Sequence, residues 1–258
     1  MINICFCGKI DSRDKVQRGM KMEKVIYLTN GSAALSESYQ QIESLKGTGK
    51  SKNLRAHHTA MQPIRSKEDF DKFCTYFLSN QNYRDYALFI VGIELGTLRS
   101  CDLLKLKIKD VYDGKEFRDT VYGVVEQKTG KIKNVYIPDG AKEALKLYLS
   151  HRCVQSLQEP LFISRKGNQL SERQAREILS KAAKAIGVTY PVAMHTLRKT
   201  WGYHTFINHK NDNMALMDIM KSYNHSAPGI TLRYIGMDEE HRKEMCMGFE
   251  IKGEDQHE

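Results

Sequence analysis

The first strong pattern of apolar and polar positions begins at Ser66. The stretch "SKED" places a carboxylate three residues after this serine, an arrangement that caps the start of a helix. Apolar residues then recur every three or four positions, which predicts an amphipathic helix. They are Phe70, Phe73, Cys74, Phe77 and Leu78. We therefore expect a globular domain to start here.

A second segment, "YRDYALFIVGIELGT", has almost no polar face between Tyr86 and Leu95. Such a helix is stable only when it is buried on all sides, and it is too short to span a membrane. Further along, "DTVYGVVEQ" and "KIKNVYIP" are rich in β-branched residues and flank "KTG". Because Gly130 can adopt a positive φ, this pattern predicts an antiparallel hairpin.

Helical spacing returns after the hairpin. Residues 140–151 form one expected helix, and Ser171 with Gln174 caps another that ends at Gly187. Further helices are expected at 195–208, 214–222, 228–235 and 238–247. The predicted fold class is therefore mainly α with a small antiparallel β-sheet (α+β).

The amino-terminal region lacks such patterns. Residues 1–62 are rich in Ser, Gly, Lys and Gln, and "SLKGTGKSKNLRAHH" is typical of a solvated basic linker. The sequence thus predicts a poorly patterned basic region at 1–62 and a folded domain at 63–258.

Charge narrows the function classes. The 258-residue chain has 40 Lys and Arg against 31 Asp and Glu, a net charge of +9, which favours nucleic acid over a membrane surface as partner. A basic protein without such a partner explains the charge equally well. The sequence shows neither an apolar run long enough to span a membrane nor a secretory signal, so we expect a cytoplasmic protein. Six dispersed cysteines match neither a disulfide framework nor a zinc site.

Four polar stretches now stand out together. Arg99 follows the buried helix in "ELGTLRSCDLLKL", with Asp102 three positions later. Lys128 lies at the mouth of the hairpin. The last two stretches are "MHTLRKTWGYHTF", with His195 and Arg198 on one helical face, and "YNHSAPGITLRYIG", with His225 and Tyr234.

In this order, these residues resemble the active site of the tyrosine recombinase (phage integrase) family over about residues 63–245. The resemblance implies the catalytic-domain fold of DNA breaking-rejoining enzymes and site-specific strand exchange through a 3′-phosphotyrosyl intermediate. It implies no metal, ATP or other cofactor. The implied catalytic residues are Arg99, Lys128, His195, Arg198, His225 and Tyr234.

The chemistry of phosphodiester cleavage supports the same assignment. Without a metal, the reaction needs a nucleophile, cations for the phosphate and an acid for the departing oxygen. Tyr234 suits the first role, and Arg99 with Arg198 suits the second because a guanidinium fork matches phosphate oxygens. His225 would donate a further hydrogen bond to the phosphate. Lys128 is the candidate acid, and His195 would handle the tyrosine proton.

Supporting roles are also expected. Asp102 replaces the family's commoner Glu and is expected to orient Arg99. Surface lysines are expected to contact the DNA backbone, with plain solvation as the alternative. They are Lys105, Lys107, Lys131 and Lys133.

The sequence departs from the family pattern in three places. Asn224 stands where glycine is usual, and Trp201 and His204 occupy positions where small or apolar residues are commoner. We expect Trp201 to be core, on one helical stripe with Leu197 and His204. Residues 1–62 are short for the family's core-binding domain, so they would form at most a reduced version of it.

Two other functions stay open at this point. One is a catalytically silent DNA-binding or regulatory module of the same fold, and the other is a type IB topoisomerase-like enzyme. The implied partner is double-stranded DNA, bound by a homo-oligomer, a tetramer. The resemblance implies that the carboxyl-terminal tail from Asp238 to Glu258 docks on a neighbouring protomer. Folding back on its own chain is the alternative.

Overall fold

The computed structural model describes residues 61–212, 214–237 and 246–247. The element order is α2 (Lys67–Ser79), α3 (Tyr83–Glu94), α4 (Ser100–Leu104), α5 (Ile108–Val111), β1 (Thr120–Val125), β2 (Ile132–Tyr136), α6 (Asp139–Ser150), α7 (Glu172–Ala185), α8 (Met194–Asn208), α9 (Ala215–Tyr223) and α10 (Pro228–Ile235). The fold class predicted from the sequence, mainly helical with a small antiparallel sheet, is confirmed.

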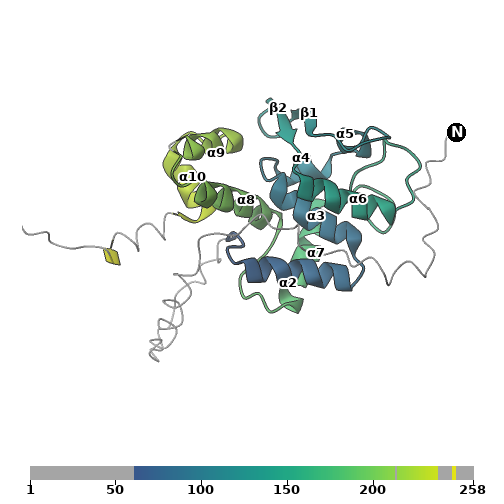
Figure 1. The fold of residues 1–258 in the computed structure, drawn as a ribbon, viewed down its shortest axis with the longest axis horizontal. Coiled ribbons are helices and arrows are strands. Elements are labelled where there is room, and N and C mark those ends of the chain that lie inside the picture. Colours follow the sequence, from purple (N-terminus) through teal and green to yellow (C-terminus); the bar gives the residue numbers. More distant parts are fainter. Residues whose placement is uncertain (1–60, 213, 238–245, 248–258) are drawn as a thin grey trace, which may run out of the picture. The chain divides into compact units, whose positions relative to one another are not determined.

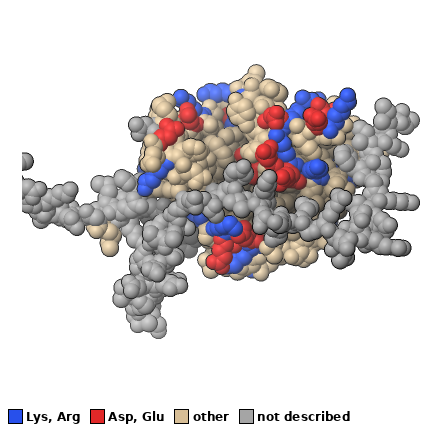
Figure 2. All heavy atoms as spheres, in the orientation of Figure 1, with Lys and Arg blue, Asp and Glu red and all other residues tan. Residues whose placement is uncertain are grey.

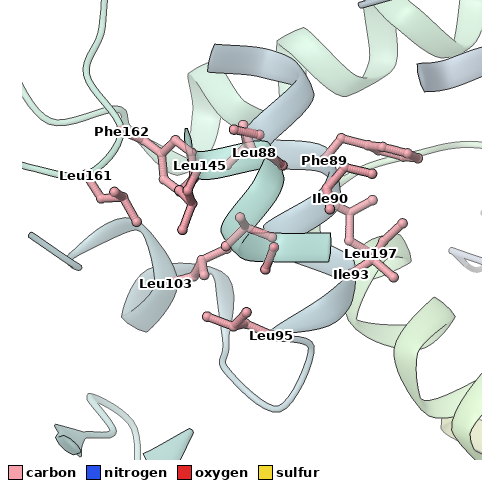
Figure 3. Close-up of a cluster of buried hydrophobic side chains, with 14 of the residues drawn as sticks. Leu88, Phe89, Ile90, Ile93, Leu95, Leu103, Leu145, Leu161, Phe162 and Leu197 are labelled. Carbon is pink, nitrogen blue, oxygen red and sulfur yellow. The ribbon is translucent and has the colours of Figure 1, made fainter. Parts of the chain in front are cut away.

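Helix α3 is the centre of the main core. Seven consecutive residues, 87–93, are buried, because α3 packs against α2, α6 and α8 (Figure 1). Figure 3 shows its Leu88, Phe89 and Ile93 meeting side chains of α4, α6 and α8. Burying such side chains contributes roughly 1.5–3 kcal/mol each. The apolar segment of the sequence is therefore the scaffold of the domain.

The end of α3 runs directly against α8. A Cβ atom on Gly96 would lie 2.3 Å from Cβ of Trp201, so only glycine allows this close approach. Leu197 of α8 is fully buried in the main core, and Trp201 packs against a second cluster. The contact fixes the loop after α3, which leads to Arg99, relative to the helix that carries Arg198.

The second cluster joins α8, α9 and α10. Its buried members are Ile219, Tyr223, Ile235 and Met237. Gly202 of α8 makes room for this packing, since a Cβ atom there would lie 2.4 Å from the phenolic oxygen of Tyr223. The carboxyl-terminal helices are thus held against α8 by aromatic and aliphatic side chains.

Strands β1 and β2 form the expected hairpin. They pair antiparallel, with Val121 opposite Val135 and Val125 opposite Ile132, and a bulge interrupts the register between Val121 and Val124. Gly130 in the turn has φ +67°, as the sequence predicted.

One detail of the element prediction differs from the structure, and one prediction is not tested. The four-residue helix α5 was not predicted, because so short a helix carries no periodicity. The helix expected at 238–247 lies outside the described residues except for positions 246 and 247. In the part of the chain that is described, no helix has both the length and the apolar character needed to cross a membrane.

Candidate active site

Arg198 is the most firmly held side chain of the site. It lies on α8, is only 7% exposed, and donates a hydrogen bond from Nη1 to the carbonyl oxygen of Gly96 at 2.9 Å. Its guanidinium carbon lies 4.3 Å from the centre of the Tyr223 ring, a cation–π geometry. The Tyr223 hydroxyl in turn donates to the Arg198 carbonyl oxygen. This side chain therefore keeps one orientation without a ligand.

Arg99 lies at the start of α4 and is held by a different carboxylate from the one expected. Its Nη1 donates to Oε2 of Glu126 at 2.7 Å, and the side chain is 21% exposed. Asp102 instead accepts the backbone N–H of Gln127 at 3.0 Å. The expectation that Asp102 orients Arg99 is therefore wrong: Asp102 anchors the hairpin, and Glu126 orients the arginine.

His225 follows α9 and faces the first turns of α10. Its Nδ1 lies 3.0 Å from Oγ1 of the buried Thr231. In the tautomer in which Nδ1 accepts this hydrogen bond, Nε2 carries the proton and can donate to another group. Desolvation, together with the charges of Arg198 and Arg99, lowers the pKa of His225.

Tyr234 of α10 completes the group of side chains that we call the pocket: Arg99, Arg198, His225 and Tyr234. Its ring centre is 5.3 Å from that of His225 and 5.2 Å from that of Tyr223. Burial raises the pKa of the Tyr234 phenol, while Arg198, by charge and hydrogen bonding, and Arg99 act in the opposite direction. The phenol thus lies within the influence of both arginines, so the structure brings together Arg99, Arg198, His225 and Tyr234.

The hairpin lysines differ in position. Lys128 is exposed in the turn, and no described residue pairs with it. Lys133, expected on the DNA-facing surface, is only 19% exposed: its Nζ lies 2.7 Å from Oε1 of Glu126 and donates to the Thr97 carbonyl oxygen. Burial lowers the pKa of Lys133, and Glu126 opposes that effect. The structure therefore places Lys133, rather than Lys128, inside the pocket.

The remaining predicted residues lie around the pocket. Lys131 donates to Oδ1 of Asn224 at 3.2 Å, Lys105 donates to Oε1 of Gln127 at 3.0 Å, and Lys107 is exposed. His195 is exposed in the first turn of α8, one turn before Arg198. Desolvation is the main cause that lowers the pKa of His195. The charge of Arg198 lowers it further, whereas the charge of Glu172 raises it.

Sequence reasoning missed Glu126, the burial of Lys133 and the support from Tyr223 and Thr231. Glu126 is fully buried although it lies next to a turn. One signal was present: it is the only carboxylate between the two apolar strands of the hairpin, 120–136. Two of its partners, Arg99 and Asn224, come from distant segments, so no local pattern in the sequence reveals these contacts.

These side chains have the chemistry that phosphodiester transfer needs. Two guanidinium groups and an amine supply positive charge, an imidazole supplies a neutral donor, and a phenol supplies a nucleophile, the set needed to transfer a phosphodiester. Among the described residues, no group of three His, Cys, Asp or Glu side chains is arranged to hold a metal ion.

Comparison with known proteins identifies the family. The model of the phage integrase family matches residues 66–241. The chain is 39% identical over 181 residues to the probable integrase/recombinase YoeC of Bacillus subtilis, covering 70% of this chain and 92% of that protein. It is 32% identical over 167 residues to the tyrosine recombinase XerC of Thermodesulfovibrio yellowstonii, covering 61% of this chain and 52% of XerC. The chain thus spans about half the length of that XerC.

Solved structures share the fold at low sequence identity. The XerA recombinase superposes with a TM-score of 0.57 at 20% identity, covering 79% of this chain and 68% of XerA. The XerH recombinase in a post-cleavage complex with its palindromic difH substrate superposes with a TM-score of 0.56 at 16% identity, covering 76% and 55% of the two chains. Since the family model matches most of the sequence, the chain belongs to the phage integrase family of tyrosine recombinases, enzymes that cut and rejoin DNA at specific sites.

Proposed function

We propose that Tyr234 is the nucleophile of a site-specific recombinase acting on double-stranded DNA. Its phenolic oxygen attacks a backbone phosphorus and forms a 3′-phosphotyrosyl bond as the bond to the 5′ oxygen breaks. The phenolic proton leaves through His195, and the departing oxygen takes a proton from Lys128. The 5′ hydroxyl of a second strand then attacks the phosphotyrosyl phosphorus, which joins the two strands and releases Tyr234. The close packing of Tyr234 with His225, under the charge of both arginines, carries this proposal.

The other groups stabilise the reacting phosphate. Arg99 and Arg198 hold the non-bridging oxygens, and His225 donates from the ring nitrogen that faces away from Thr231. Each preorganised donor of this kind contributes about 3 kcal/mol to transition-state stabilisation. The pKa of Tyr234 is raised by burial, so the phenol is neutral at pH 7 and needs a proton acceptor as it attacks.

The assembly belongs to the same proposal. The protein would act in the cytoplasm as a homotetramer on DNA, with the tail 238–258 docked on a neighbouring protomer. Residues 1–62 would be a reduced DNA-contacting segment ahead of the catalytic domain at 63–258. Residues 1–60 and most of the tail lie outside the described part of the chain.

The decisive test is covalent capture. The full-length protein is incubated with a pool of nicked duplexes of random sequence, and adducts that survive denaturation are collected and sequenced. We expect recovery of a preferred site, with the DNA attached to Tyr234. Tyr234→Phe removes only the attacking oxygen and should give no adduct, whereas Tyr122→Phe, at an exposed hairpin tyrosine, should behave as wild type.

Three outcomes separate the functions. Adduct formation with strand exchange between two duplexes supports the recombinase. An adduct with supercoil relaxation but no exchange supports the topoisomerase-like enzyme. Sequence-selective binding without any adduct, equal in wild type and Tyr234→Phe, would refute the proposed chemistry and leave a binding module.

A further inference from the structure

Glu126 joins segments that are far apart in the sequence. Its side chain is 0% exposed, and Oε2 accepts hydrogen bonds from Arg99 at 2.7 Å, Thr129 at 2.6 Å and Asn224 at 2.8 Å. Its other oxygen, Oε1, pairs with Lys133 at 2.7 Å. A buried carboxylate is stable only with such partners. Here they come from the start of α4, the hairpin and the end of α9.

The charge of Glu126 suits the pocket. Besides desolvation by burial, the positive charges of Arg99 and Arg198 lower the pKa of Lys133, and that of Arg99 lowers the pKa of Arg198. The negative charge of Glu126 acts in the opposite direction on both groups. A single carboxylate among these cations limits their mutual repulsion and leaves a positive excess. Such an excess can stabilise the negative charge of a phosphodiester under attack by the Tyr234 phenol.

Asn224 extends the contact to the loop that carries His225. It is the C-cap of α9 in the left-handed conformation, with φ 57°, which asparagine tolerates better than most residues other than glycine. Its amide nitrogen donates to Glu126, and its amide oxygen accepts from Lys131. Glycine, expected at this position from the family resemblance, would keep the backbone conformation but could make neither contact. The substitution thus links the hairpin to the residue before His225.

We infer that Glu126 is a positioning residue for strand cleavage: it fixes Arg99 and Lys133 in the phosphate pocket and, through Asn224, couples the hairpin to the His225 loop. The inference rests on the proposed function for its catalytic consequence. The coupling itself is a property of the fold and can be measured without DNA.

The catalytic test compares full-length variants on the nicked duplex recovered by covalent capture. Glu126→Gln keeps the size of the side chain but removes its charge. We expect adduct formation to slow by about 10- to 100-fold, the effect typical of groups that orient a ligand-binding side chain. Affinity for the same duplex, measured in a Tyr234→Phe background, should stay equal or rise, because a negative charge near the phosphates is lost. Glu116→Gln, at an exposed glutamate before β1, should change neither quantity.

Two further variants separate positioning from folding. Glu126→Asp retains the charge and should recover part of the rate lost in Glu126→Gln. Asn224→Gly preserves the left-handed backbone, so it should fold normally yet slow adduct formation. In hydrogen exchange without DNA, Asn224→Gly should speed exchange in the hairpin 126–136 as well as in its own loop, while Glu126→Gln should speed exchange at 224–231.

The outcomes are distinct. Absence of an adduct with wild-type protein refutes the proposed function, and hydrogen exchange then decides the coupling alone. Wild-type adduct formation with equal rates in Glu126→Gln and Asn224→Gly overturns the inference. A parallel loss of rate, affinity and melting temperature in Glu126→Gln, with Asn224→Gly unaffected in both rate and exchange, also overturns it, since Glu126 would then act only on stability.

Discussion

The two pocket arginines are held in different ways. Arg198 is fixed by a neutral carbonyl and an aromatic ring, whereas Arg99 is fixed by the charge of Glu126. A planar guanidinium can satisfy such a partner with one nitrogen and still present others to a phosphate. A lysine ammonium is a compact point charge, so it cannot keep the contact with its protein partner and present a planar pair of donors to a phosphate at the same time.

Arg198→Lys should therefore impair chemistry beyond its loss of affinity. We expect single-turnover adduct formation to fall by about 100- to 1000-fold, the cost of one preorganised donor. The matched control is Arg233→Lys, at an exposed arginine next to Tyr234, which should react like wild type. Equal rates for the two variants would show that Arg198 does not contact the reacting phosphate.

At this scale, the sequence predicted the residues whose chemistry is distinctive. The structure brings Arg99, Arg198, His225 and Tyr234 together. Glu126 could not be found in the same way. A carboxylate beside a hairpin turn is normally solvated, and only the long-range contacts with Arg99 and Asn224 make it internal.

The secondary structure elements follow local chemistry where that chemistry is strong. Ser66 and Ser171 cap α2 and α7 as expected, each accepting a backbone N–H three residues later. The bulge in β1 was not predicted. It occurs where Gly123, at φ +66°, donates its N–H to Oδ1 of Asn134, and this side-chain partner lies on the opposite strand. Helix α6 is a second case that local sequence does not explain, because its N-cap residue, Pro138, has no side chain that can accept a hydrogen bond.

The carboxylate of Glu94, on α3, accepts a hydrogen bond from the Ala141 N–H in the first turn of α6 and so serves as its cap. Burial raises the pKa of its carboxyl to about 7. The hydrogen bond from the Ala141 N–H lowers this pKa, whereas the negative charges of Glu143 and Asp139 raise it further. The folded pKa thus lies above the unfolded value of 4.5. The folded state holds the proton more tightly, so the stability that Glu94 contributes is complete below pH 4.5 and is lost as the pH rises through 7.

Glu94→Gln should remove this dependence. We expect its melting temperature to match wild type at pH 5 and to exceed it at pH 8, by an amount that corresponds to at most about 3 kcal/mol. Thermal unfolding of both proteins at the two pH values measures the difference. Glu116→Gln, at an exposed glutamate that does not act on Glu94, serves as the control. A melting difference that is the same at pH 5 and pH 8 would contradict the assignment.

For the whole molecule, the distribution of charge along the chain differs from its distribution over the described surface. On the face drawn in Figure 2, Lys and Arg side chains lie among Asp and Glu rather than in a single basic patch. Several of the described Lys and Arg side chains are ion-paired, such as Lys67 with Asp71 and Lys142 with Asp119. Along the sequence, residues 1–60 contain ten Lys and Arg against five Asp and Glu, a net +5, and residues 61–237 contain 27 against 18, a net +9. Residues 238–258 contain three against eight, a net −5. Per residue, the positive excess is therefore higher in residues 1–60 than in residues 61–237, although both segments are basic.

This distribution predicts where the salt dependence of DNA binding arises. Neutralising the four linker cations Lys46, Lys50, Lys52 and Arg55 with Gln should reduce the slope of log affinity against log salt by about 3 to 4, since each phosphate contact contributes about 0.9. The matched control neutralises Lys67, Lys72, Lys142 and Arg173, each paired with a carboxylate. It removes the same charge but should change the slope little, because paired cations displace fewer counterions. Equal changes in both variants would mean that net charge alone, not the linker, governs the attraction to DNA.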